Sequence, residues 1–70
     1  MGIRIKNYGD DAECKTIIEL QKLLYEKYRG KSITINANGI NHFVDVDANG
    51  DVSDSYRGNA ISLDTFKSPL

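Results

Sequence analysis

The residues most able to carry chemistry stand between positions 45 and 53, where oxygen-bearing side chains recur at every second position. They are Asp45, Asp47, Asn49, Asp51 and Ser53, with Gly50 among them. Carboxylate, amide and hydroxyl oxygens are the ligands that calcium prefers, and a glycine permits the sharp turn that gathers them. The spacing is compatible with two interpretations, a calcium loop or the tip of a β-hairpin.

From Asp45 onward, about nine positions resemble the calcium loop of EF-hand proteins and the related loops of dockerin modules. The resemblance implies a metal site, but it ends at Tyr56, which stands where an EF-hand loop has its bidentate acid. Asp-Ala-Asn-Gly also suits a type I turn followed by a left-handed glycine. The segment 36–39, Asn-Ala-Asn-Gly, has the same shape without an acid cluster. We therefore predict a hairpin, with weak calcium binding by residues 45–53 as the alternative.

Cysteine and histidine, the other residues with useful chemistry, occur once each, at Cys14 and His42. A lone thiol cannot form a disulfide within the chain, and in a stretch with helical character it is typical of a small buried side chain in a reducing compartment. Two ligands make a poor zinc site, and the sequence contains no nucleophile motif and no glycine-rich phosphate loop. We therefore predict a protein that is not an enzyme and needs no cofactor, with His42 in the core or at its edge.

The chain has 70 residues, enough for one domain. No apolar run has the length of a membrane span, and the first residues lack the pattern of a signal peptide. We predict one α+β domain over residues 1–66 and a short flexible tail over 67–70, located in the cytoplasm without membrane association.

Charge is distributed unevenly, although the net charge is only −1. Residues 1–35 contain seven Lys and Arg and five Asp and Glu, whereas residues 36–70 contain two basic residues and five Asp. An acidic surface repels phosphate, which disfavours direct nucleic-acid binding, and it complements a basic protein partner. Between residues 11 and 31 the basic residues are mixed with glutamates, which is typical of a solvated helix face.

Hydrophobic spacing predicts one strand followed by one helix in the first half of the chain. Residues 3–8 alternate between apolar and polar types, which indicates a half-buried strand. Asp10 and Glu13 suit a capping box at a helix start, and Gly30 suits a helix stop. We predict a helix over 11–29 whose apolar stripe consists of Cys14, Ile17, Leu20, Leu24 and Tyr28.

After Gly30 the period changes to two, and Asn38-Gly39 and Asn49-Gly50 mark hairpin turns. Residues 59–66 alternate again, so the predicted order is β-α-β-β-β-β, an amphipathic helix on one face of a small antiparallel meander sheet. The residues expected to face the helix are Ile33, Ile35, Ile40, Val44, Val46, Val52, Ile61 and Leu63.

The opposite sheet face is the surface that we expect to bind a partner. The predicted patch consists of Phe43, Asp45, Asp47, Asp64 and Phe66. Strand alternation places these side chains away from the helix. Aromatic rings within a polar rim are typical of protein-binding patches, and the acids would suit a basic partner.

These features predict a small non-catalytic protein-binding module. It would act as an inhibitor or adaptor on a basic partner such as a nucleic-acid-processing enzyme. In size and charge the chain is similar to compact acidic proteins of phages and mobile elements, including anti-CRISPR proteins, and this likeness implies an anti-defence role. The main alternative is a self-associating structural or regulatory protein that uses the same Phe face as a homodimer interface.

Overall fold

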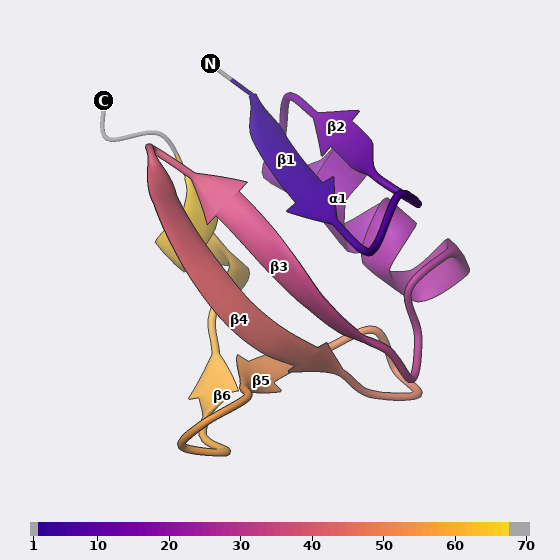
Figure 1. Cartoon of the computed structure of the whole chain (residues 1–70), viewed down its shortest axis with the longest axis vertical. Helices are drawn as coiled ribbons and strands as arrows, with labels where there is room; N and C mark the ends of the chain where they lie inside the picture. The colour runs from indigo at the N-terminus through magenta and orange to yellow at the C-terminus, as the bar shows by residue number, and fades with distance from the viewer. Residues whose placement is uncertain (1, 68–70) are drawn as a thin grey trace.

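A computed structural model describes residues 2–67. Its elements are β1 (Ile3–Lys6), β2 (Ala12–Cys14), α1 (Ile17–Glu26), β3 (Ser32–Ala37), β4 (Ile40–Val46), β5 (Val52–Asp54), β6 (Ala60–Ile61) and the 3₁₀ helix η1 (Leu63–Phe66). The strands form an antiparallel sheet in the order β2-β1-β3-β4-β5-β6, with the long strands β3 and β4 at its centre (Figure 1). Residues 68–70 of the predicted tail lie outside the described residues.

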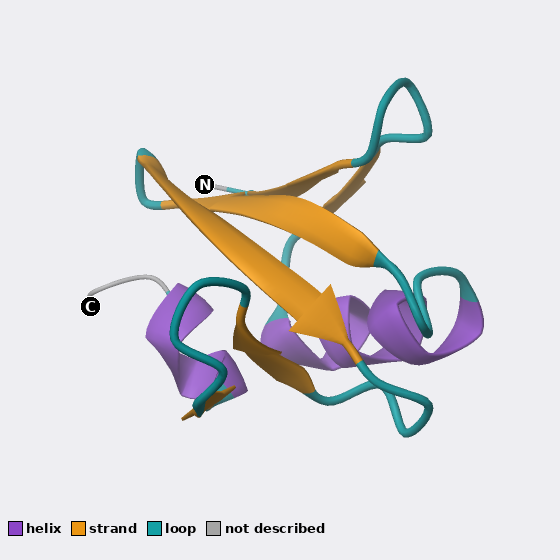
Figure 2. Cartoon of the chain, turned by 60° about the horizontal axis from the view of Figure 1, so that its bottom comes forward, coloured by secondary structure: helices purple, strands orange, loops and turns teal. Residues whose placement is uncertain are grey.

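The helix α1 and the short η1 lie on the same face of the sheet (Figure 2). We call this the covered face and the opposite one the open face. Leu20 and Leu24 of α1 are fully buried and belong to one apolar cluster with Ile5, Ile35 and Val44 from three strands. The predicted α+β architecture, one helix packed on one face of an antiparallel sheet, is confirmed.

A strand that the sequence analysis did not predict precedes the helix. Residues 12–14, expected as the first helical turn, form β2 and pair with β1. The chain reverses just before, where the Asp10 N–H donates to the Asn7 carbonyl at 2.9 Å. Tyr8 and Gly9 at the centre of this turn have positive φ angles of 50° and 93°, as in the turns that suit hairpins. The predicted order β-α-β-β-β-β is therefore wrong at this point, because the reversal supplies β2 with a partner strand.

The helix is shorter than the predicted range 11–29, and a different residue caps it. Thr16 has an extended backbone, and its side chain accepts a hydrogen bond from the Glu19 N–H at 3.1 Å. Thr16 and Glu19 thus have the spacing of a capping box, which the sequence analysis assigned to Asp10 and Glu13. Both patterns were present in the sequence, and the pairing of β2 excludes the earlier one.

Both Asn-Gly sequences form hairpin turns, as predicted. Asn38 and Gly39 have φ angles of 54° and 79° and connect β3 to β4. The turn between β4 and β5 spans residues 47–51 and contains Gly50 at φ 81°. The meander from β3 to β6 is antiparallel throughout.

The core contains most of the residues predicted for it. The buried sheet residues from that set are Ile33, Ile35, Val44, Val46 and Val52, while Ile61 and Leu63 are partly buried. Cys14 is buried as expected, although it lies on β2 rather than on the helix. Ile40 differs from the prediction, since it stands at the start of β4 beside the turn and is 59% exposed.

Phe66 is buried in the core, so the prediction that its ring lies on the open face is wrong. The strand predicted over 59–66 ends after β6, because the Ser62 hydroxyl accepts a hydrogen bond from the Asp64 N–H and caps η1. This helical turn breaks the alternation and brings Phe66 to the covered face. Its ring meets that of His42 at 5.0 Å between centroids, in an edge-to-face arrangement.

Candidate functional site

The open face of the sheet is a polar surface with one aromatic side chain near its centre. Paired residues on neighbouring strands point the same way, so the open face is organised in rows across the sheet. The middle row joins Lys6 of β1, Thr34 of β3 and Phe43 of β4. The next row joins Ser32 to Asp45. Because α1 and η1 both lie on the covered face, neither helix covers these side chains.

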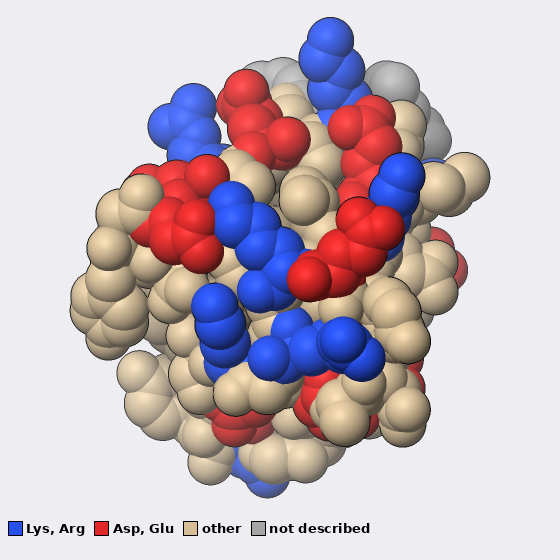
Figure 3. Space-filling model, turned by 90° about the vertical axis from the view of Figure 1, so that its right-hand side faces the viewer, with Lys and Arg blue, Asp and Glu red and all other residues tan. Residues whose placement is uncertain are grey.

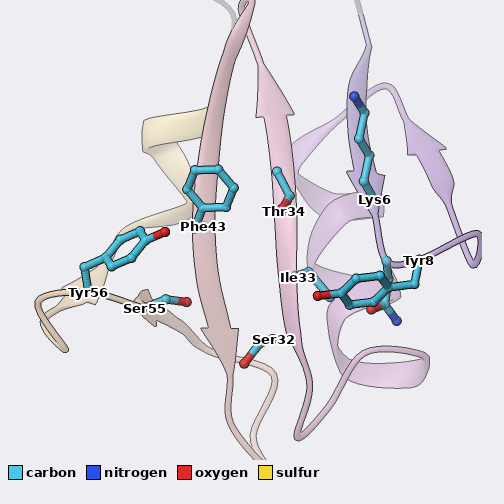
Figure 4. Close-up of a pocket in the computed structure, with 9 residues that line it drawn as sticks. Lys6, Tyr8, Ser32, Ile33, Thr34, Phe43, Ser55 and Tyr56 are labelled. Carbon is cyan, nitrogen blue, oxygen red and sulfur yellow. The ribbon is translucent and has the colours of Figure 1, made fainter.

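A hollow of about 410 Å³ lies over these rows, and we call it the aromatic hollow (Figure 4). Its lining includes Lys6, Tyr8, Ser32, Thr34, Phe43 and Tyr56. Phe43 and Tyr56 stand on one side and Tyr8 on the other, with Thr34 between them (Figure 4). Three strands and two loops contribute these residues, so the aromatic hollow exists only once the sheet has formed.

The two tyrosines of the aromatic hollow are among the most exposed side chains of the described chain. Tyr8 is fully exposed and Tyr56 is 82% exposed. The rings of Tyr56 and Phe43 meet edge to face, with centroids 5.9 Å apart. Tyr8 also has a left-handed backbone, which costs a non-glycine residue about 1 kcal/mol. The turn between β1 and β2 explains this backbone, so it is the exposure of the two rings that indicates a surface role.

Asp45 is held in place by hydroxyl groups on both sides of β4. Ser32 Oγ and Ser55 Oγ donate to its Oδ1 at 2.7 Å and 2.9 Å. These bonds, with Ser32 first, hold the pKa of the Asp45 carboxyl below its ordinary value, so the group is ionised at neutral pH. No Lys or Arg among residues 2–67 forms an ion pair with it. Asp45 is thus an oriented negative charge without a cation of its own.

The structure separates the five residues that were predicted to form one binding patch. Phe43 and Asp45 share the open face, and Asp47 lies in the turn after β4. Asp64 is exposed on η1, in the layer that packs on the covered face, and Phe66 is buried. The acidic rim predicted around two phenylalanines is therefore wrong, and the open face has Lys6 on one side of Phe43 and Asp45 on the other.

The residues of the alternative calcium loop serve the hairpin turn instead. Asp47 Oδ1 accepts hydrogen bonds from the backbone N–H groups of Asn49 and Asp51, at 2.8 Å and 3.0 Å. Asp45 stands on the open face with its serine partners. Among residues 2–67, no group of three or more His, Cys, Asp and Glu side chains is arranged to hold a metal ion.

Tyr8, Tyr56 and Lys6 are among the residues of the open face that the sequence analysis missed, as are Ser32 and Ser55. A weak signal was present, because Tyr8 and Tyr56 lie one and two residues before a turn glycine, with no adjacent apolar residue that would explain them. Nothing in the sequence joined them, since they are far apart in the chain and line one hollow with Phe43 only once the sheet has formed.

No family model, curated protein or solved structure matches this chain. The chemistry of the open face itself therefore carries the functional assignment. A surface that combines exposed aromatic rings with hydroxyl and amide groups can bind a partner through contact area and adaptable hydrogen bonds. Within residues 2–67, no helix combines the length and apolar character of a membrane span.

The side of the molecule that carries α1 and β2 has mixed charge. Acidic and basic side chains lie next to one another over this part of the described surface (Figure 3). Lys27 Nζ pairs with Asp10 at 2.9 Å, and Arg4 pairs with Glu13 at 3.5 Å. Such a surface is typical of a solvated helix face, whereas nucleic-acid binding calls for a continuous basic stripe.

Proposed function

We propose that this protein is a small non-catalytic binding module that attaches to another protein through the open face of its sheet. The observation that carries the proposal is the clustering of Tyr8, Phe43 and Tyr56 around the aromatic hollow, on the face that neither helix covers. Exposed aromatic clusters of this kind are costly to leave in water and are typical of interaction sites.

The composition of the open face supports a protein partner rather than a small substrate. Tyrosine offers a large contact area at a low cost in conformational entropy, and serine, threonine and asparagine adapt their hydrogen bonds to the partner. Asn36 and Asn41 extend this polar surface beyond Phe43, and their side chains hydrogen-bond to each other at 2.8 Å. The open face therefore offers a partner aromatic contact area together with hydrogen-bonding groups from several strands.

The environments of Cys14 and His42 support the absence of catalysis in this proposal. Cys14 is buried, and this burial is the main reason why the pKa of its thiol is raised. The negative charges of Glu19 and Glu13 raise the pKa further. A raised pKa disfavours the nucleophilic thiolate. The His42 ring packs against Phe66 in the core. Neither side chain lines the aromatic hollow.

The partner that we propose is a basic protein, and the protein would act on it as an inhibitor or adaptor in the cytoplasm. Support comes from the acidic second half of the chain and from the ionised Asp45 beside Phe43. A nucleic-acid-processing enzyme has a basic groove of the required sign, which makes an anti-defence role of the phage type the specific form of the proposal. Self-association through the same rings is the competing use of this face.

Capture from lysate with matched variants tests the proposal. The wild-type protein and the double variant Tyr8→Ala/Tyr56→Ala serve as baits, and Ile18→Ala is the control because Ile18 is exposed on α1, away from the aromatic hollow. We expect a stoichiometric basic protein that the wild type and the control capture and the double variant loses. A protein captured equally by all three baits would refute the assignment of this face.

Sedimentation of the purified protein distinguishes binding of another protein from self-association through the open face. A monomer at all concentrations is expected. A dimer that Tyr8→Ala/Tyr56→Ala dissociates and Ile18→Ala leaves intact would contradict the proposed partner and make the open face a self-association surface.

A further inference from the structure

We infer that Asp45, Phe43 and Tyr56 form a recognition site for an arginine side chain presented by the partner. The inference deepens the proposed function and rests on it. It commits the open face to an occupant of defined chemistry, a guanidinium group, and follows from the geometry of the three side chains.

The first step is the state of the carboxylate. An ionised carboxylate has about four acceptor sites, two on each oxygen. Ser32 and Ser55 both donate to Oδ1, so the two sites on Oδ2 remain for a partner, and residues 2–67 provide no hydrogen bond to that oxygen. The two hydroxyls also fix the orientation of the group, which reduces the entropy lost when a cation binds.

The second step is the position of the aromatic rings beside the carboxylate. Phe43 precedes Asp45 by two residues on β4 and on the same face, a separation of roughly 7 Å along the strand. Tyr56 follows Ser55, whose hydroxyl contacts Asp45, and its ring meets that of Phe43 at 5.9 Å. In an edge-to-face pair, one of the two rings contacts the other only through its edge. The faces of that ring are therefore not covered by the pair and can receive a cation.

The third step is the choice of arginine over lysine. A guanidinium group is planar and weakly hydrated, and it can stack on an aromatic ring while its N–H groups donate to a carboxylate. An ammonium group is a strongly hydrated point charge that uses an aromatic face less well. The same stacking of a guanidinium on a tyrosine ring occurs elsewhere in this chain. The Arg29 guanidinium lies over the Tyr25 ring at 4.5 Å from its centroid.

The fourth step is the local charge. The Asp54 carboxylate is close enough to raise the pKa of Asp45 slightly against the lowering by the serines, so it adds negative potential at this point. Arg4 and Lys6 are cations on the same face, but both stand on β1, two strands away from β4, or roughly 10 Å. Arg57 follows Tyr56, and its charge acts on Asp54. Asp45 and Asp54 thus place two carboxylates against one guanidinium on the side of Tyr56, which leaves negative charge where we place the partner's arginine.

A titration followed by NMR tests this inference without knowledge of the partner. The probe is N-acetyl-arginine amide, and the uncharged citrulline analogue and the lysine analogue are the comparison compounds. We expect saturable shifts in the backbone amides around Phe43, Asp45 and Tyr56, with a dissociation constant on the order of 1–10 mM, because one side chain makes few contacts. The lysine analogue should bind more weakly, and the citrulline analogue should not saturate.

Two variants, each of which removes one negative charge, make the test more specific. Asp45→Asn should weaken the binding of the arginine probe by about fivefold, as expected for the loss of an exposed charge pair. Asp64→Asn is the control, because it removes the same charge from η1, away from the aromatic hollow, and should leave the affinity unchanged. Equal shifts with the citrulline analogue, equal affinity in Asp45→Asn, or no saturable shifts around Phe43 would overturn the inference.

The outcomes also distinguish this inference from the proposed function. Arginine binding at Asp45 in a protein whose capture does not depend on Tyr8 and Tyr56 would keep the arginine site and refute the docking face. Capture that depends on the two tyrosines, with no response to the arginine probe, would keep the docking face and overturn the arginine site.

Discussion

Gly50 lies directly against the backbone of Tyr25, so the turn between β4 and β5 is packed on the helix. A Cβ atom built on Gly50 would stand 3.1 Å from the Tyr25 Cα and 3.2 Å from its Cβ. Gly50 also has a φ of 81°, in the left-handed region that favours glycine. The sequence 47–50 is therefore needed for its shape and its close approach to α1, which is a structural reason for the motif that resembled a calcium loop.

Gly50→Ala should destabilise the protein by about 2–3 kcal/mol, because it adds a steric overlap to the cost of a left-handed alanine. Gly39→Ala is the matched control, since Gly39 has a similar φ of 79° and no atom within 4 Å of an added Cβ. It should cost only about 1 kcal/mol. Urea denaturation of the two variants measures the difference, and equal losses would show that the turn does not pack on α1.

The same substitution at the two phenylalanines should have different effects. Phe66→Leu should cost about 1–2 kcal/mol, because Phe66 is buried and packs against His42. Phe43→Leu should change the stability by about 0.5 kcal/mol or less, since Phe43 is about half exposed. Chemical denaturation tests both, and a larger loss for Phe43→Leu would place that ring in the core.

Removal of the helix cap distinguishes the observed helix start from the predicted one. Thr16→Ala should lower the free energy of unfolding by about 1 kcal/mol and reduce the helical circular dichroism signal, because the Glu19 N–H loses its acceptor. Asp10→Ala should cost less, because its side chain only pairs with the exposed Lys27, and the Tyr28 hydroxyl donates to its backbone oxygen. The reverse order of effects would support the earlier helix start.

The serine contacts of Asp45 predict a defined response to pH. Ser32→Ala/Ser55→Ala should raise the pKa of Asp45 toward its ordinary value of 3.8, because the hydrogen bonds that favour the ionised form are lost. A carboxyl whose pKa is lower in the folded state stabilises the protein above its unfolded pKa, and this contribution is lost as the pH falls through the folded pKa.

The wild type should therefore lose stability as the pH falls from about 4 to below the folded pKa of Asp45, and the double variant should lose less over that range. NMR titration of the Asp45 carboxyl carbon measures the pKa directly. Ser53→Ala is the control, since Ser53 lies opposite Asp45 on β5 and has no hydrogen bond to its side chain in the structure. An unchanged pKa in the double variant would contradict the role of the two serines.

The elements specified by neighbouring residues could be predicted from the sequence. Asn38-Gly39 adopts the positive φ angles of a two-residue hairpin turn, because asparagine and glycine both tolerate such angles at low cost. The apolar stripe that includes Leu20 and Leu24 identifies the buried side of the helix, and the alternation in β3 and β4 identifies the covered face. These features depend on residues a few positions apart, so local patterns are sufficient.

Residues 12–14 and Phe66 show where local patterns were not sufficient. Cys14 has the correct spacing for the helix stripe and for a strand, and only the return of the chain beside β1 decides between them. Phe66 fits a strand that ends on the open face, but the cap of η1 at Ser62 brings it to the core beside His42. In both cases the local pattern fits more than one structure, and contacts with distant parts of the chain select one.

The sequence by itself therefore determined the fold class, the hairpin turns, most of the core and the exposure of Phe43 and Asp45. The tertiary structure alone decided that Tyr8 and Tyr56 line one hollow with Phe43, and that Ser32 and Ser55 hold Asp45. The physical reason is that a surface site combines side chains from strands and loops that are far apart in the chain. Their alignment depends on the pairing of the whole sheet, which no local pattern records.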